Sequence, residues 1–304
     1  MKKEFYFPSK DGITQIHAVE WIPEGEVKAV LQIAHGMVEH IERYSGFSSF
    51  LASKGIYVTG HSHLGHGKSM VSKEKMGYFA AKNGNACVVG DIHQLRILTQ
   101  EKYPAVPYFV LGHSMGSFLI RQYLGMYGEK ISGAIIMGTG EQPDAILTGG
   151  KLVCKMIAAF KGWMHRSDFV NGLVIGKFKK EMGNGWLSRN EENVKKYAAD
   201  PRSGFVFTLN AFYNMFDGLS KMNALEKAGK FPKELPLFFV AGSEDPVGDH
   251  GKGVKTVYQR YVEKGAKNAV IKLYEGDRHE ILNELDKEVV YADILAWIEK
   301  NIDN

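Results

Sequence analysis

The chain has 304 residues, of which 44% are hydrophobic and 24% are charged, and its net charge at pH 7 is +4. No stretch approaches the roughly 20 consecutive apolar residues that cross a bilayer, so the composition favours a soluble globular protein. Lysines alternate with acidic residues instead of clustering, which argues against a nucleic-acid partner.

The N-terminus and the cysteines indicate the cellular compartment. "MKKEFYFPSKDG" has no apolar run of the signal-peptide kind, so we expect a cytoplasmic location. Cys87 and Cys154 are far apart and lie in helical patterns, which favours reduced, buried thiols over a disulfide. The sequence gives no clear sign of an oligomeric state.

The order of apolar segments predicts the fold class. Residues 4–8 and 13–21 alternate apolar and polar positions around the turn "SKDG", so they are expected to form an antiparallel hairpin. Most of the gaps between the later runs show helical periodicity. Buried parallel strands that alternate with helices indicate an α/β sheet covered on both faces. Six short apolar runs are predicted as the buried strands: 29–36, 55–61, 108–114, 131–139, 235–243 and 268–276.

The segment "GHSHLGHGKS" at 60–69 places His61, His63 and His66 at a spacing that metal-dependent hydrolases use. One alternative function is therefore metal-dependent hydrolysis. Gly65 stands where such sites carry an acid, and His93 lies in a helical pattern instead of a loop. We therefore predict no metal and no cofactor, and expect His66 to bond the loop backbone.

The motif "GHSMG" at 112–116 follows a predicted strand and opens a helical pattern. In this context Gly-x-Ser-x-Gly is typical of a nucleophile elbow, in which a tight turn exposes the central serine. Ser114 is therefore the candidate nucleophile. The alternative is that Ser114 only caps the following helix.

The connection between the strands near Gly138 and Leu235 spans about ninety residues, whereas a helical crossover needs only about thirty. We expect a helical cap at 141–222 and a core made of 1–140 and 223–304. Ser188 and Glu191 resemble a capping box that begins one cap helix. Most of the cap's large apolar side chains are expected to pack between helices, and the remainder to line an apolar pocket; they are Met156, Phe160, Trp163, Phe169, Phe178, Phe205, Phe207, Phe212 and Phe216.

A nucleophilic serine needs a base and an acid that orients the base. Asp245 follows the predicted strand at 235–243 directly, and His279 follows the strand at 268–276. Their order after Ser114 matches the order of the triad in this kind of fold. Glu244 and Asp249 compete with Asp245 for the role of the acid.

The oxyanion of the reaction needs two backbone N–H donors. One is expected from Met115, which follows the nucleophile. The other is expected from Met37, in the loop "HGMVEH" after the strand at 29–36. The side chains of the two methionines play no part in this prediction.

Several motifs together resemble one known family: "HGMVEHIERY", "GHGKS", "GHSMGS", "WLSRNEENVKKYAADPRSGFVFT", "GSEDPVG" and "RHEILNE". The chain resembles the α/β-hydrolase superfamily over about residues 10–300, and within it the monoacylglycerol lipase and lysophospholipase-like group labelled serine aminopeptidase S33. The resemblance implies a mostly parallel sheet with helices on both faces and a helical cap after the sixth strand. It also implies the triad Ser114, Asp245 and His279, with Met37 and Met115 as oxyanion donors.

The resemblance further implies that Glu39 and Arg43 lie near the polar end of the acyl site, although pairing that braces the loop would explain them equally well. His113 is a third candidate for substrate binding. Two positions depart from the family pattern. Ser62 replaces a common aspartate, and Leu282 replaces a second histidine of the animal monoacylglycerol lipase.

These observations predict a serine carboxylester hydrolase that acts on single-acyl-chain lipids such as monoacylglycerols or lysophospholipids. Its partner is then a small acyl ester, with a possible transient contact between the cap and a membrane surface. An S33-type aminopeptidase or amidase is the alternative on the same fold, but prolyl iminopeptidase-like members carry an H-G-G-P loop where this chain has "HGMVEH". A binding protein with an inactive site is disfavoured by the complete set of catalytic segments.

Overall fold

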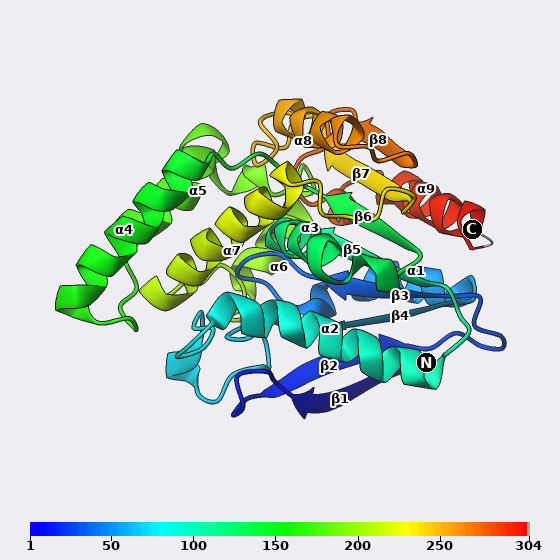
Figure 1. Ribbon diagram of the computed structural model, residues 1–304, viewed down its shortest axis with the longest axis horizontal. Coiled ribbons are helices and arrows are strands. Elements are labelled where there is room, and N and C mark those ends of the chain that lie inside the picture. Colours follow the sequence, from blue (N-terminus) through cyan, green and yellow to red (C-terminus); the bar gives the residue numbers. More distant parts are fainter. Residues whose placement is uncertain (303–304) are drawn as a thin grey trace.

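The computed structural model describes residues 1–302, which are organised around one eight-stranded sheet (Figure 1). The strand order is β1-β2-β4-β3-β5-β6-β7-β8. β2 pairs antiparallel with both β1 and β4, and the strands from β4 to β8 are parallel. The strands are β1 Lys2–Pro8, β2 Gln15–Trp21, β3 Ala29–Ala34, β4 Ile56–His61, β5 Tyr108–His113, β6 Gly133–Met137, β7 Leu237–Gly242 and β8 Ala269–Tyr274.

The central strands are apolar throughout because both of their faces are buried. In β3, Val30 and Ala34 belong to one hydrophobic cluster, while Leu31 and Ile33 belong to the cluster on the opposite face. Successive side chains of a strand point to opposite faces, so a strand covered on both sides needs apolar residues at every position. The predicted hairpin and all six predicted strands are confirmed.

Helices cover both faces of the sheet (Figure 1). Residues of α2, α3 and α8 contribute to one of the two hydrophobic clusters, and residues of α1 and α9 contribute to the other. This arrangement confirms the predicted α/β-hydrolase fold. The covering helices are α1 Ser45–Ser53, α2 Gly84–Lys102, α3 Met115–Tyr127, α8 Lys252–Glu263 and α9 Lys287–Lys300.

The long connection between β6 and β7 is helical, as predicted, and projects to one side of the sheet in Figure 1. It contains α4 Asp144–Lys161, α5 Asp168–Met182, α6 Glu191–Ala199 and α7 Leu209–Lys227. α7 packs against α4 on one side and against α3 on the other. The boundary predicted between residues 222 and 223 therefore falls inside a helix that touches both layers.

The start of α6 differs from the prediction. Its N-cap is Asn190, whose side chain accepts hydrogen bonds from the N–H groups of Glu192 and Asn193 at 3.1 and 3.4 Å. Ser188 lies two residues earlier, and its Oγ accepts from the N–H of Asn190 at 3.0 Å. The predicted capping box at Ser188 is therefore wrong, because the chain turns into the helix only at the better-placed amide side chain.

Two further features concern the chain as a whole. Cys87 and Cys154 are both buried free thiols, as predicted. Burial raises the pKa of the Cys154 thiol to about 11, so it is protonated at neutral pH. Within residues 1–302 every helix is too short or too polar to cross a bilayer.

Candidate active site

Ser114 lies at the turn between β5 and α3, with φ +53° and ψ −120°. A positive φ is costly for a residue with a side chain, so surrounding contacts must hold the turn. The N–H of Ser114 donates to the carbonyl of Met137 at 3.0 Å. A Cβ on Gly116 would lie 2.0 Å from the carbonyl oxygen of Ala34, and one on Gly112 would lie 2.3 Å from that of Gly116. The Gly-x-Ser-x-Gly spacing therefore follows from a turn with no room for larger side chains.

His279 and Asp245 form a buried pair between the loops that follow β8 and β7. The Nδ1 of His279 lies 3.0 and 2.9 Å from the two carboxylate oxygens of Asp245. A carboxylate only accepts, so Nδ1 carries the hydrogen and Nε2 is left as the basic nitrogen. Glu244 instead lies 4.0 Å from the guanidinium of Arg278, and Asp249 is exposed. Of the three candidate acids, Asp245 is the one beside the histidine.

The ring of His279 lies between two other rings. Its centroid is 4.7 Å from that of His113, the last residue of β5, and 5.1 Å from that of Trp186. Trp186 ends the 3-10 helix η4 (Gly183–Trp186), which belongs to the inserted segment. The insertion therefore supplies one wall of the space around His279.

The loop after β3 is held on several sides. The N–H of Gly36 donates to Glu39 at 2.6 Å, and the N–H of Val38 donates to His66 at 3.3 Å. Among the described residues the N–H groups of Met37 and Met115 donate no hydrogen bond. Both methionines line the same cavity as Ser114. Two backbone N–H groups without an acceptor thus belong to residues that line the cavity beside Ser114.

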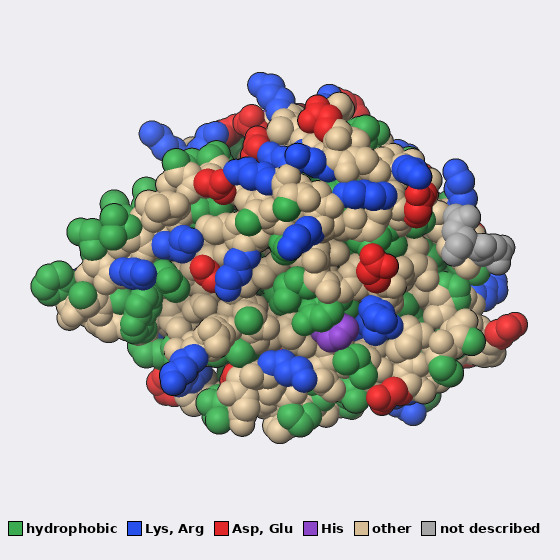
Figure 2. Space-filling view, viewed as in Figure 1, with side chains coloured by type: hydrophobic (Ala, Val, Ile, Leu, Met, Phe, Trp, Pro, Cys, Tyr) green, Lys and Arg blue, Asp and Glu red, His purple; other side chains and the backbone are tan. Residues whose placement is uncertain are grey.

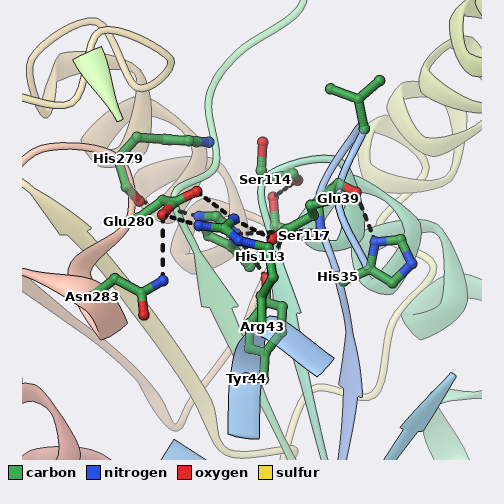
Figure 3. Close-up of polar contacts among 12 residues, drawn as sticks. His35, Glu39, Arg43, Tyr44, His113, Ser114, Ser117, His279, Glu280 and Asn283 are labelled. Carbon is green, nitrogen blue, oxygen red and sulfur yellow. Dashed lines mark hydrogen bonds and ion pairs between the residues drawn. The ribbon is translucent and has the colours of Figure 1, made fainter. Parts of the chain in front are cut away.

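A buried polar cluster joins the loop after β3 to the loop after β8 (Figure 3). The Nη1 of Arg43 donates to Glu39 at 2.8 Å and to Glu280 at 2.7 Å, and its Nη2 donates to Glu280 at 2.7 Å. Asn193 of α6 donates to the same Glu280 carboxylate at 2.6 Å. The loop after β3, the loop that carries His279 and the insertion therefore meet at the guanidinium of Arg43.

The neighbouring charges decide the protonation states of this cluster. Burial would raise the pKa of Glu39, but the hydrogen bond with His113 and the charge of Arg43 hold it well below its usual range. Burial likewise opposes ionisation of Glu280, and Arg43 outweighs it and lowers the pKa. Burial would lower the pKa of His113, whereas its contact with Glu39 raises it. Both carboxylates are therefore ionised at neutral pH.

The three residues predicted to bind substrate differ in their placement. Glu39 and His113 line the cavity beside Ser114. Arg43 is not among the described lining residues; its guanidinium lies between two carboxylates and 4.8 Å from the ring centroid of Tyr197. Arg43 therefore does not line the cavity itself, but it contacts Glu39, which does.

A cavity of about 800 Å³ opens from Ser114 and His279 toward the inserted helices. Cavities of this size accept drug-sized organic molecules, and apolar walls favour a hydrocarbon part. Its apolar wall from the insertion includes Ile146, Leu147, Val153, Leu173, Val174, Ile175, Phe178, Trp186, Leu187, Met215, Phe216 and Leu219. Of the large apolar residues singled out in the sequence, Phe178 and Phe216 lie in this wall.

The histidines of 60–69 are buried within the protein. The Nδ1 of His66 lies 2.9 Å from the carbonyl oxygen of Leu64, which confirms the predicted backbone bond. Burial lowers the pKa of His66 to about 4 and that of His61 to about 3, so both are neutral. Ser62, the departure from the family pattern, is buried, and its hydroxyl has no partner within residues 1–302. No set of three metal-ligating side chains that could hold an ion occurs in the described part of the chain.

Residues 185–193 of the insertion are tied to the loop that carries His279. The backbone N–H of Arg189 donates to both carboxylate oxygens of Glu284 at 3.0 and 3.1 Å, and its guanidinium pairs with Asp277 and Asp286. Three further hydrogen bonds join the two segments: Glu280 N–H to the Leu187 carbonyl (2.8 Å), Asn190 Nδ2 to the Asn283 carbonyl (3.1 Å) and Arg278 Nη1 to the Gly185 carbonyl (2.8 Å).

Sequence reasoning missed Glu280, Tyr44, Trp186 and Asn193 as parts of the site. Glu280 carried no clear signal, because an acid after the predicted base in "RHE" resembles a surface charge until its distant partner Arg43 is known. Trp186 and Asn193 come from the insertion, and no local sequence pattern shows which residues of the insertion contact the core. Their roles depend on contacts between distant segments.

The overall geometry is shared with solved α/β hydrolases. A thermostable carboxyl esterase from Bacillus coagulans, solved in complex with glycerol, superposes with a TM-score of 0.91 at 29% identity over 99% of both chains. A monoglyceride lipase from Saccharomyces cerevisiae superposes with a TM-score of 0.78 at 18% identity over 99% and 97% of the two chains, which supports the fold alone.

Sequence relatives agree with the structural ones. A monoglyceride lipase homolog of monkeypox virus is 28% identical over 93% of this chain and 94% of its own length. The mouse monoglyceride lipase is 26% identical over 93% and 86% of the two chains, and a monoacylglycerol lipase of Mycolicibacterium smegmatis is 24% identical over 99% and 98%. The family model described as serine aminopeptidase, S33, matches residues 25–286. The chain therefore belongs to the serine aminopeptidase S33 family of α/β hydrolases.

Proposed function

We propose that this carboxylester hydrolase cleaves esters of a single acyl chain, such as monoacylglycerols or lysophospholipids, with Ser114, His279 and Asp245 as its catalytic triad. The observation that carries the proposal is the buried pair of His279 and Asp245 at the floor of an apolar cavity that Ser114 also lines. The lipase names of the relatives support the same substrate class.

The proposed mechanism has two steps. The Nε2 of His279 takes the proton of Ser114 Oγ as the oxygen attacks the ester carbonyl, and the N–H groups of Met37 and Met115 stabilise the resulting oxyanion. The alcohol leaves with the proton from His279, and the acyl group stays on Ser114. Water then gives a proton to His279 and attacks the acyl carbonyl, and His279 returns that proton to Ser114 Oγ as the bond to the acyl group breaks, which releases the fatty acid and restores the serine hydroxyl.

The proposed substrate position follows the polarity of the cavity. The acyl chain lies against the apolar walls supplied by α4, α5 and α7, and the alcohol part lies toward Glu39 and His113. Arg43 acts on this end through its bond to Glu39. A glycerol complex of a related esterase agrees with a small polar alcohol group.

We also propose that the insertion contacts a lipid surface. Figure 2 shows hydrophobic side chains gathered at the end of the molecule formed by α4 and α5. Their exposed members are Ile146, Leu152, Met156, Phe160, Phe169 and Leu173. An exposed apolar patch beside a lipid-sized cavity would let a substrate enter from a membrane surface.

The cytoplasmic location of the protein stays a prediction.

The test is hydrolysis of a panel of monoacylglycerols, lysophospholipids, short aryl esters and aminoacyl amides by the wild type and Ser114→Ala. Loss of a catalytic serine lowers kcat by about a million-fold in the best-studied serine hydrolases, so we expect Ser114→Ala to be inactive while its circular dichroism is unchanged. A folded variant with wild-type esterase activity would refute the triad. Preference for aminoacyl amides would replace the lipid proposal by the aminopeptidase alternative.

A further inference from the structure

His113 has contacts that determine its protonation state. Its Nε2 lies 3.1 Å from the backbone carbonyl oxygen of His279. A carbonyl oxygen only accepts, so Nε2 must carry a hydrogen. Its Nδ1 lies 2.9 Å from the hydroxyl oxygen of Tyr44, and the direction of that bond depends on where the single hydroxyl hydrogen of the tyrosine points.

The hydroxyl hydrogen of Tyr44 is already committed. Its oxygen lies 2.8 Å from Oε1 of Glu39, and two oxygens this close share a hydrogen. Glu39 also accepts from the N–H of Gly36 at 2.6 Å and from Arg43 at 2.8 Å. Both donors favour the ionised carboxylate, so the shared hydrogen belongs to Tyr44 and not to Glu39. The hydroxyl oxygen of Tyr44 must then accept from His113.

Because both ring nitrogens donate, we propose that His113 is an imidazolium cation in the resting enzyme and that it is a positioning residue. Its two N–H groups link the segment of Glu39 and Tyr44 to the backbone of the His279 loop (Figure 3). Both loops are thereby held at the end of β5, where His113 directly precedes Ser114.

The charges around His113 agree with this state. Glu39 and Tyr44 face it from the loop after β3, and Glu280 and the ring of His279 face it from the loop after β8. Arg43 bridges the two carboxylates. With His113 charged, two cations balance two buried carboxylates; with His113 neutral, one negative charge would remain uncompensated, which is costly in a buried site.

The direct test is ¹⁵N NMR of the wild-type enzyme labelled at histidine, with the signals of His113 assigned by their loss in His113→Gln. We expect both ring nitrogens of His113 to carry hydrogens at pH 7. An unperturbed histidine, whose pKa is about 6.5, has mostly lost one of them at this pH. A ring with one protonated nitrogen at pH 7 would overturn the proposal. This measurement does not use activity, so it stands apart from the proposed function.

The titration of His113 in Glu39→Gln is a second measurement, and a merely structural role of His113 would leave it unchanged. Removing the carboxylate charge should lower the pH at which His113 loses its second hydrogen, because the contact with Glu39 is what raises its pKa. An unchanged titration of His113 in a folded Glu39→Gln variant would contradict the assigned hydrogen bonds.

The effect on rate rests on the proposed roles of Ser114 and His279. His113→Gln should lower kcat by about 10- to 100-fold with a smaller change in KM, as for a small misplacement of catalytic groups. The matched control is His93→Gln on α2, a partly buried histidine whose Nδ1 lies 3.0 Å from the hydroxyl of Tyr123. The control should keep wild-type kcat, and an equal loss in both variants would overturn the positioning role.

Discussion

Gly116 leaves the space that the tight turn at Ser114 requires. The helix α3 begins directly after Ser114 and approaches the end of β3 so closely that a Cβ at Gly116 would overlap the carbonyl oxygen of Ala34. The obstacle is backbone and not a flexible side chain, so it cannot move aside without displacing the strand. The second glycine of the motif is therefore required by packing, whatever the chemistry of the serine.

Gly116→Ala should lower the free energy of unfolding by about 1–3 kcal/mol, the usual range for overpacking, and should slow the labelling of Ser114 by a phosphonate. The control is Gly172→Ala in α5, where an added Cβ meets no atom within 4 Å. That change should raise the stability slightly, by up to about 1 kcal/mol, because alanine favours the helix. Urea unfolding measures the free energy of unfolding of both variants. Equal values would contradict the close approach of Gly116 to Ala34.

At the scale of the elements, one buried ion pair joins three helices. Arg121 of α3 donates to Glu226 of α7 at 2.7 and 2.9 Å, and the hydroxyl of Tyr261 of α8 donates to the same carboxylate at 3.0 Å. The guanidinium also donates to the side chain of Thr139 at 3.0 Å and to the carbonyl of Gly140 at 2.9 Å. The helix that follows Ser114, the last helix of the insertion and the point where the insertion leaves the sheet thus share one guanidinium.

Glu226→Gln should lower the free energy of unfolding at pH 7 by about 3 kcal/mol, because it leaves a buried guanidinium without its counter-charge. Burial alone would raise the pKa of Glu226, but Arg121 outweighs it and lowers it. The ionised carboxylate therefore stabilises the fold fully above about 4.3, its unfolded pKa, and this contribution is lost as the pH falls through the lower folded value. The difference between wild type and variant should shrink below about pH 4.

Urea unfolding at pH 7 and at successively lower pH measures this difference. Glu191→Gln, which removes an exposed glutamate that pairs with Lys195 on α6, serves as the control and should change the stability by less than about 0.5 kcal/mol at either pH. A difference that stays constant down to pH 3 would show that the ionisation of Glu226 is not its source.

The strands and the tight turn at Ser114 could be predicted because their determinants are local. An apolar run with glycine at its end indicates a buried strand, and Gly-x-Ser-x-Gly between a strand and a helix indicates the turn. The Arg121–Glu226 pair could not be predicted, because its partners are 105 residues apart and each alone resembles a surface charge. The same holds for Glu280, whose partner Arg43 is 237 residues away.

At the scale of the whole molecule, the insertion presents two contrasting faces. Side chains such as Leu147 and Phe216 point into the cavity or the core, whereas Phe160 is 92% exposed and Phe169 is 63% exposed. The sequence showed these aromatic residues but not which of them face water, because the helical pattern of α5 has no clear apolar side. An outer apolar face on the part that roofs the cavity is consistent with the proposed contact with a lipid surface.

The double variant Phe160→Asp, Phe169→Asp should bind phospholipid vesicles at least about tenfold more weakly than the wild type, since burying one large apolar side chain is worth about 1.5–3 kcal/mol. Hydrolysis of a short soluble ester should not change, because neither residue lines the cavity. Ile13→Asp, which places one negative charge at another exposed apolar residue between β1 and β2, controls for the effect of an added surface charge. Vesicle binding equal in the wild type and the double variant would contradict the surface contact.

The attachment of residues 185–193 to the His279 loop limits how the insertion can be exchanged between relatives. A chimera whose donor insertion lacks an arginine at position 189 would leave Asp277, Glu284 and Asp286 without that counter-charge, and they would then repel one another in the segment that carries His279. A graft restricted to α4 and α5 would leave that attachment in place while changing most of the acyl-facing wall. From the proposed function we therefore expect α4 and α5 to control the substrate range and residues 185–193 to preserve activity.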